Sequence, residues 1–249
     1  MKLNNKTCLI TGGTRGIGAA TAISVAREGA DVAIVGRNAD DEAISVKEKV
    51  EGLGQRCELI RKDLSTPEAG INCVKETVEK LGGIDVLVHS AGGAVPGDIL
   101  TCKPEDWMDS MNVHVNSTFF LCQAAAPYLI EKKEGAIVLI SSVAAIRGLK
   151  GGIAYGTAKA AVIQLTRMVA YQLADYNIRV NCVVPGVIRT AFHDSMPEEV
   201  KQHNIANRIP LHKEGTAQDV ANAILELMKN EYMTGSELVI DGGLTSRTV

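Results

Sequence analysis

Short apolar runs, rich in β-branched residues, alternate with longer amphipathic segments along the whole chain. The apolar runs predict strands at Thr7–Ile10, Asp31–Val35, Arg56–Ile60, Asp85–Val88, Ala136–Ile140, Arg179–Val184 and Glu237–Ile240. The segments between them predict helices over 16–28, 40–52, 67–80, 104–132, 153–175 and 216–229. Because the apolar runs are continuous and not alternating, we expect strands covered on both faces. The pattern predicts an α/β fold, a doubly wound parallel sheet with helices on both faces.

Composition narrows the protein class without changing this fold. The chain has 249 residues, 46% of them hydrophobic, and a formal net charge of −3. No linker or repeat divides it, so we expect a single domain over 1–249. The near-neutral balance argues against nucleic acid as a partner. The longest uncharged stretch, 110–130, contains Asn, His, Gln and Pro, which predicts a buried helix and not a membrane span.

Cysteine and histidine usage points to an intracellular protein without a bound metal. The six cysteines are scattered and form no CxxC pair, as is typical of reduced thiols in a cytoplasmic protein. The five histidines include no i,i+4 pair and have no neighbouring cysteine. We therefore predict cytoplasmic localisation and no metal site.

A glycine-rich turn follows the first predicted strand. It reads Thr11-Gly12-Gly13-Thr14-Arg15-Gly16-Ile17-Gly18 and opens the first predicted helix. Glycines let the backbone pass close to a pyrophosphate, and a helix N-terminus attracts anions. The alternative is a tight strand–helix connection with no ligand. Its place in a strand–helix–strand unit favours a dinucleotide site in a Rossmann-like domain.

The end of the second predicted strand bears on which dinucleotide is bound. An acidic residue there would bond the ribose 2′-hydroxyl of NAD, whereas arginine accommodates the 2′-phosphate of NADP. Gly36 brings no carboxylate, and Arg15 and Arg37 both have the reach to contact a phosphate. Arg37 has the alternative of a solvated surface residue. We predict NADP(H) over NAD(H).

Tyr155 and Lys159 are four residues apart on one predicted helix. Their side chains share one helix face, so the ammonium is expected to lower the pKa of the phenol toward neutrality. Tyr155 is then a candidate general acid/base. Ser142 follows the end of a predicted strand, where its hydroxyl would polarise a carbonyl oxygen or simply end the strand.

Taken in order, these motifs resemble the short-chain dehydrogenase/reductase family, in particular its 3-oxoacyl reductase-like branch. The family's catalytic serine and its YxxxK motif match Ser142 and Tyr155–Lys159, and its Pro-Gly turn matches Pro185-Gly186. The resemblance implies hydride transfer between NADP(H) and an alcohol/carbonyl pair. Together, the turn, the arginines and the family motifs predict a cofactor site formed by Gly12, Thr14, Arg15, Gly16, Ile17, Gly18, Arg37, Asp63, Leu64, Ser90, Ala91, Gly92, Tyr155, Lys159, Pro185, Gly186, Ile188 and Thr190.

The chain departs from the family pattern at two places. The fourth-strand motif Asn-Asn-Ala-Gly is here His89-Ser90-Ala91-Gly92, and the family's catalytic asparagine falls on His114. A neutral imidazole is able to hold a water, so we predict that His114 takes over the relay of protons toward Lys159. The alternative is a histidine satisfied in the core or at a subunit contact.

The predicted substrate site is formed by Ser142, Tyr155, Arg147, Val187 and Phe192, under a lid at roughly 191–213. Arg147 would bind a carboxylate or face solvent. The uncharged helices around 113–130 and 153–174 predict a homotetramer, as is common in the family. The substrate is predicted to be a small or medium carbonyl/alcohol compound. The alternatives are a 3-oxoacyl thioester, or no substrate at all in a dinucleotide-sensing binding protein of the same fold.

Overall fold

A parallel sheet of seven strands forms the centre of the computed structural model, which describes residues 1–193 and 196–246. The strand order is β3-β2-β1-β4-β5-β6-β9. The strands are β1 (Thr7–Thr11), β2 (Asp31–Gly36), β3 (Cys57–Arg61), β4 (Val86–His89), β5 (Gly135–Ile140), β6 (Ile178–Pro185) and β9 (Glu237–Ile240). Each of the seven predicted strands is confirmed, with ends that differ by at most one residue.

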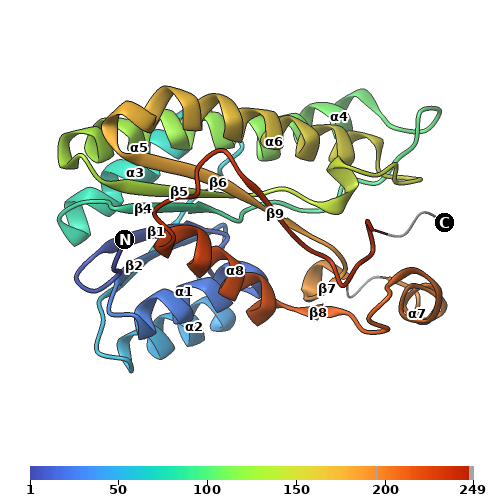
Figure 1. The fold of residues 1–249 in the computed structure, drawn as a ribbon, viewed down its shortest axis with the longest axis horizontal. Coiled ribbons are helices and arrows are strands. Elements are labelled where there is room, and N and C mark those ends of the chain that lie inside the picture. Colours follow the sequence, from blue (N-terminus) through green and yellow to red (C-terminus); the bar gives the residue numbers. More distant parts are fainter. Residues whose placement is uncertain (194–195, 247–249) are drawn as a thin grey trace.

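Helices cover both faces of this sheet, which confirms the doubly wound α/β architecture (Figure 1). One layer contains α1 (Gly16–Arg27), α2 (Asp41–Glu51) and α8 (Ala217–Lys229). The other contains α3 (Pro67–Leu81), α5 (Ser117–Lys132) and α6 (Ile153–Leu173), with α4 (Pro104–Met111) beside α6.

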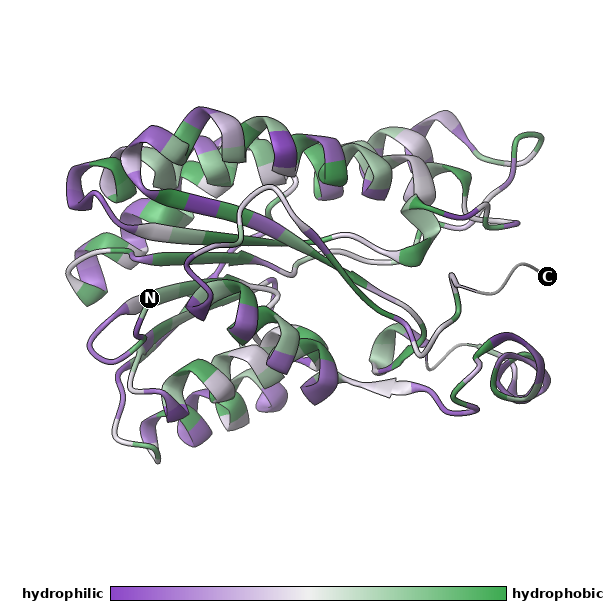
Figure 2. Cartoon of the chain, in the orientation of Figure 1, coloured by the Kyte–Doolittle hydropathy of each residue, from purple (hydrophilic) through white to green (hydrophobic). Residues whose placement is uncertain are grey.

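Alternate residues of each strand supply the two cores. In β1, Cys8 and Ile10 pack toward α1 and α8, whereas Leu9 packs toward α3 and α5. All three are fully buried. Since both sheet faces are covered, both sets must be apolar, which explains the continuous apolar runs of the sequence. Figure 2 shows the result, with hydrophobic strands inside and hydrophilic residues along the outer sides of the helices.

The order of the strands reverses between β1 and β4. β1 pairs with β2 on one side and with β4 on the other, and all of these pairs are parallel. Connections therefore leave the carboxyl ends of β1 and β4 in opposite directions and open a crevice between them. In sheets of this kind ligands bind in that crevice, so we expect the functional groups to lie around it.

The helix predicted over 104–132 is interrupted. Between α4 and α5 the backbone widens into one π-helical turn, Asn112–Asn116, which we call the π-turn. Such turns are rare and occur frequently at functional sites. His114 lies at its centre.

The predicted lid, 191–213, has structure of its own in its described part. It contains a 3₁₀ turn at Ala191–His193, α7 (Glu198–His203) and a second π-helical turn at Asn204–Arg208. The short strands β7 (Ile188–Arg189) and β8 (Gly215–Thr216) pair at its base. Residues 194 and 195 lie outside the described residues. Within residues 1–193 and 196–246, none of the helices combines the length and the apolar character needed to cross a bilayer.

Candidate active site

The loop between β1 and α1 depends on the conformation of its glycines or on the close packing around them. Gly12 and Gly16 have φ angles of +65° and +54°. A Cβ on Gly12 would lie 2.8 Å from the backbone nitrogen of Ala91, and one on Gly18 would lie 2.1 Å from the carbonyl oxygen of Gly12. Arg15, the N-cap of α1, makes no capping hydrogen bond with its side chain. The first-turn N–H groups of α1 are therefore available to an anion, which fits the pyrophosphate of a dinucleotide.

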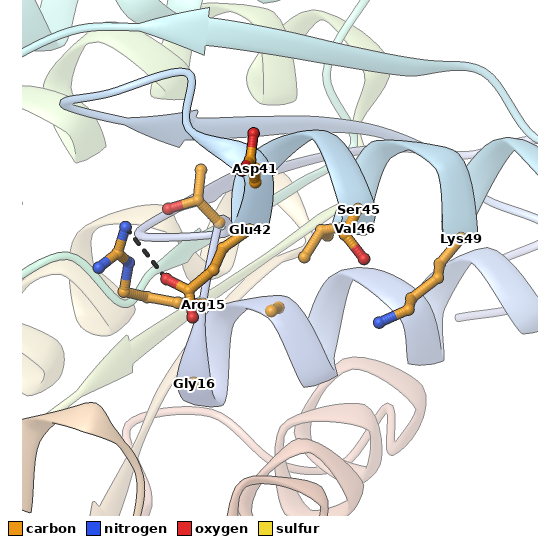
Figure 3. Close-up of a pocket in the computed structure, with 9 residues that line it drawn as sticks. Arg15, Gly16, Asp41, Glu42, Ser45, Val46 and Lys49 are labelled. Atoms are coloured by element: carbon orange, nitrogen blue, oxygen red, sulfur yellow. Dashed lines mark ion pairs between the residues drawn. The ribbon is translucent and has the colours of Figure 1, made fainter. Parts of the chain in front are cut away.

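A cavity of about 400 Å³ lies between this loop and α2 (Figure 3). Arg15 stands at one end of it. Its Nη2 lies 2.5 Å from Oδ2 of Asp40 and 3.2 Å from Oε2 of Glu42. The arginine thus shares its charge with two carboxylates at the start of α2. The lining residues are Thr14, Arg15, Gly16, Ala19, Asp41, Glu42, Ser45, Val46 and Lys49.

The end of β2 has no room for a side chain at Gly36. A Cβ there would lie 2.6 Å from Cγ2 of Thr14, which is itself buried. Thr14 thus packs against the end of β2 and also lines the cavity. The next residue, Arg37, is exposed.

The remaining predicted cofactor residues lie at or near the carboxyl edge of the sheet. Leu64 is buried after β3, and the neighbouring Asp63 accepts a hydrogen bond from the backbone of Ser65 at 3.1 Å. Thr190 meets the glycine loop, because a Cβ on Gly16 would lie 3.4 Å from Cγ2 of Thr190. Three others follow β4, namely Ser90, Ala91 and Gly92. Pro185 ends β6, and Gly186 and Ile188 come after it. Ile17 packs on the core.

Ser142, Tyr155 and Lys159 come together where β5 meets α6. The Ser142 hydroxyl accepts from the backbone of Ala144 at 3.2 Å and also hydrogen-bonds Tyr155. Nζ of Lys159 lies 5.7 Å from the centre of the Tyr155 ring and donates to the carbonyl oxygen of Ile140 at 2.8 Å. A hydroxyl, a phenol and an ammonium thus lie close together. These groups are suited to transferring a proton to an oxygen atom.

Burial shifts the pKa of Tyr155 in the direction opposite to the one predicted from the sequence. Burial raises the pKa of the Tyr155 phenol, and the hydrogen bond from Ser142 opposes it. Burial also lowers the pKa of Lys159 to about 8. The lowered Tyr155 pKa expected from the helical spacing is therefore wrong for this structure, because Lys159 donates to a backbone carbonyl and desolvation is the larger effect.

His114 lies beside the phenol, inside the π-turn. Its ring meets the Tyr155 ring edge-on, with centres 5.3 Å apart. Nε2 bonds the carbonyl oxygen of Gly93 at 3.0 Å, whereas the buried Nδ1 has no hydrogen-bond partner within the described residues. Burial, with a smaller effect of the Lys159 charge, lowers the pKa of His114 to about 3. The imidazole is therefore neutral at physiological pH.

The residues predicted for the substrate side lie in different surroundings. Phe192 lies 5.9 Å from Tyr155, ring centre to ring centre, and is 40% exposed, as suits an apolar wall. Val187 is half-buried before β7. Arg147 instead donates to the carbonyl oxygen of Thr245, so its guanidinium is engaged by the chain itself. In the described part of the chain, no three His, Cys, Asp or Glu side chains gather where they would hold a metal.

Three buried residues that the structure joins to this site had no role assigned from the sequence. His89 bonds Thr11 on one side and Ser117 on the other. Its departure from the family's asparagine was the one available signal. Nothing in the sequence distinguishes Thr11 and Ser117 from other strand-end or helix hydroxyls.

Comparison with known proteins places the chain among oxidoreductases. A family model described as enoyl-(acyl carrier protein) reductase matches residues 12–245. A 3-oxoacyl-(acyl-carrier-protein) reductase of Thermotoga maritima is 39% identical, and the match covers 98% of this chain and 99% of that protein. An L-rhamnose-1-dehydrogenase of Scheffersomyces stipitis is 36% identical, with 97% and 96% covered. A blue fluorescent protein from a metagenomic library, solved in complex with NADPH, superposes with a TM-score of 0.90 at 31% identity, with 98% and 99% covered.

Proposed function

The chain belongs to the short-chain dehydrogenase/reductase family, and from that premise we propose that it transfers a hydride between NADP(H) and the carbonyl/alcohol group of a small or medium organic substrate. One observation carries the proposal. Ser142, Tyr155 and Lys159 meet at the carboxyl edge of the sheet, where Ser142 follows β5 and the other two residues lie on α6. A binding protein without chemistry has no need of this buried trio.

Each residue has a distinct task in this proposal. Ser142 holds the substrate oxygen, and Tyr155 exchanges the proton with it. Because the pKa of Tyr155 is raised, the phenol is protonated at neutral pH, which suits proton donation to the oxygen of a carbonyl undergoing reduction. Lys159 holds the ribose hydroxyls of the nicotinamide half, and His114 takes part in the relay of protons. The bound NADP(H) supplies the hydride chemistry.

The preference for NADP(H) rests on charge and space at the end of β2. Arg15 lies in the glycine loop, the exposed Arg37 directly follows Gly36, and Gly36 leaves no room for a carboxylate. The solved neighbour that holds NADPH is consistent with this preference. Asp40 and Glu42 share Arg15, so the discrimination against NADH is expected to be modest.

Two substrate classes follow from the relatives. The name of the Thermotoga maritima protein favours a 3-oxoacyl thioester, for which Lys150 and Lys201 would contribute to a basic patch near the mouth of the pocket. The name of the Scheffersomyces stipitis protein favours a sugar. Phe192 beside Tyr155 is compatible with either.

The test combines binding with turnover. NADPH and NADH are titrated by the fluorescence of the reduced nicotinamide, and oxidation of NADPH is followed with aldehydes, ketones, sugars, oxo acids and oxoacyl thioesters. Tyr155→Phe is expected to lower kcat/KM by roughly 10²–10⁴-fold and to leave NADPH affinity within about twofold. Tyr176→Phe, at an exposed tyrosine beyond α6, is the control and is expected to match the wild type.

Each result has a defined meaning. Binding of NADPH without turnover on any carbonyl would overturn the enzyme proposal and favour a dinucleotide sensor. Tighter binding of NADH than of NADPH would overturn the assignment of Arg15 and Arg37. The best substrate of the panel identifies the chemistry that the pocket accepts.

A homotetramer in the cytoplasm completes the proposal. Phe119 of α5 and both Met168 and Tyr171 of α6 are 44–86% exposed, and these apolar side chains suit helix pairing between subunits. The six cysteines are free thiols and five are buried, in keeping with a reducing compartment. Light scattering is expected to give four times the chain mass, and the mass of a single chain would contradict it.

A further inference from the structure

A chain of hydrogen bonds runs through the interior along the imidazole of His89. Nδ1 lies 2.7 Å from Oγ1 of Thr11, and Nε2 lies 3.0 Å from Oγ of Ser117. Thr11 Oγ1 also accepts from the backbone nitrogen of Ala91 at 3.3 Å, and the Ser117 hydroxyl donates to the carbonyl oxygen of Val113. His89 is 4% exposed. Both ring nitrogens are thus bonded within the protein.

The direction of every bond in this chain follows from the proton count. Ser117 has one hydroxyl proton, which it gives to Val113, so its oxygen accepts the Nε2–H of His89. Nδ1 then has no proton and accepts the hydroxyl of Thr11, whose oxygen accepts the Ala91 N–H. Burial lowers the pKa of His89 to about 3, the Lys159 charge adds to this, and the nearby Val113 carbonyl opposes it. The imidazole is therefore neutral, with one tautomer.

This chain of hydrogen bonds ends at two backbone segments, and both of them contact or carry His114. At one end, Val113 directly precedes His114 in the π-turn, whose carbonyls are bonded by the hydroxyls of Ser117 and Thr118. At the other end, Ala91 leads through Gly92 to Gly93, whose carbonyl oxygen bonds Nε2 of His114 at 3.0 Å. Through these hydrogen bonds and the backbone, both histidines are held between the π-turn and the Gly92–Gly93 loop.

The His114 side chain has little room to move between these two segments. A Cβ on Gly92 would lie 2.4 Å from Cε1 of His114, so the ring already fills the space against the loop. Its other neighbour is the Tyr155 ring, edge-on at 5.3 Å. A change in the separation between the π-turn and the loop would therefore turn the imidazole relative to Tyr155.

We propose that His89 is a positioning residue, which holds the π-turn and the Gly92–Gly93 loop at a fixed separation and so orients His114 against Tyr155. It also couples the glycine loop to this geometry, because Thr11 immediately precedes Gly12. The kinetic consequence rests on the proposed function. The orientation of His114 does not, and it is measurable without any substrate.

Ser117→Ala is the variant that tests the proposal. It removes the acceptor of the His89 Nε2–H and adds no bulk. Displacement of His114 is expected to lower kcat by about tenfold and to move the acid limb of the pH–rate profile, with NADPH affinity and KM within about twofold. In nitrogen-15 NMR of the histidine rings, the His114 signals are expected to shift. Ser117→Thr keeps the hydroxyl and is expected to restore all three readouts.

Thr77→Val supplies the matched control. Thr77 is also buried, and its hydroxyl also donates to the carbonyl oxygen four residues earlier, Cys73, at 2.9 Å, but in α3 and with no imidazole attached. It is expected to reproduce the stability cost of Ser117→Ala without the change in pH profile or in the His114 signals.

The proposal fails if Ser117→Ala retains the wild-type pH profile, kcat and His114 signals. If no carbonyl is turned over even by the wild type, the proposed function fails, and the NMR signals alone decide the positioning role. Should Ser117→Ala not fold, Thr11→Val interrupts the same chain at its other end. It is expected to shift the His114 signals in the same assay, and unshifted signals would overturn the proposal.

Discussion

Lys159→Met is expected to make the cofactor-free protein more stable at pH 7 while it abolishes the proposed activity. Lys159 is 7% exposed, and its ammonium makes one hydrogen bond, to the carbonyl oxygen of Ile140. Within residues 1–193 and 196–246 it belongs to no ion pair. Methionine has nearly the same length and no charge to desolvate.

The magnitude follows from the pKa of Lys159. Burial lowers it from 10.5 to about 8, and at 1.36 kcal/mol per pKa unit this corresponds to about 3 kcal/mol against burying the charged form. The variant leaves the Ile140 carbonyl without its donor, which costs about 1–2 kcal/mol. The free energy of unfolding is therefore expected to rise by about 1–2 kcal/mol at pH 7.

The pH dependence provides the sharper test. At pH 7 the lysine is charged in both the folded and the unfolded state. Above pH 8 the folded lysine loses its proton while the unfolded lysine keeps it up to about 10.5. The unfolded state then binds more protons, so this group stabilises the wild type as pH rises through that window. At pH 9.5 the advantage of the variant is expected to shrink by about 2 kcal/mol.

Urea unfolding at pH 7 and pH 9.5, without cofactor, measures both effects. Lys75→Met, at an exposed lysine of α3, is the control and is expected to stay within about 0.5 kcal/mol of the wild type at each pH. A Lys159→Met protein that is less stable than the wild type at pH 7 would refute the reasoning. So would an advantage that is equal at the two pH values, because the burial of charge would then not be its source.

Three further outcomes are expected at sites around the crevice. Gly92→Ala places a Cβ 2.4 Å from the His114 ring at a φ of +154°, so thermal unfolding should show a loss of about 2 kcal/mol or more and the His114 NMR signals should move. Asp40→Asn keeps an oxygen to cap α2 but removes a carboxylate from Arg15, so titration should show NADPH affinity two- to threefold higher with NADH unchanged, and Glu48→Asn, remote from Arg15, should change neither. Thr216→Ala removes the capping box of α8 and should cost about 1 kcal/mol in urea unfolding without altering NADPH affinity.

The sheet could be predicted closely from the sequence because its signal is strong and local. A strand buried on both faces must be apolar at every position, so Ala136–Ile140 stands out and lies within β5. Helix ends were marked by glycines, such as Gly82, which is left-handed after α3. Two-residue strands such as β7 and β8 leave no periodic pattern, and they were not predicted.

The site could be predicted in its residues more than in its physics. Spacing predicted that Tyr155 and Lys159 lie together, as they do, but the direction of the Tyr155 pKa depends on burial and on where the ammonium points, which spacing does not contain. The π-turn was missed because one additional residue in a helical turn barely alters the hydrophobic period over 104–132. The role of His89 required knowing that three segments far apart in sequence meet around it.

Asp85 and Lys159 are equally buried charged residues near the sheet, but only Asp85 has an ion-pair partner among the described residues. At the amino end of the sheet, Asp85 is 7% exposed and is paired with Lys132 at 2.8 Å, and Lys6 beside it has its pKa raised, chiefly by the hydrogen bond that it donates to Glu134. At the carboxyl end, Lys159 is equally buried, but its pKa is lowered. A buried charge with a partner is compatible with a purely structural role, whereas an uncompensated one lowers stability. A cost of this kind is common at functional sites, so the burial of Lys159 supports, without any family resemblance, the proposal that its ammonium serves a bound group.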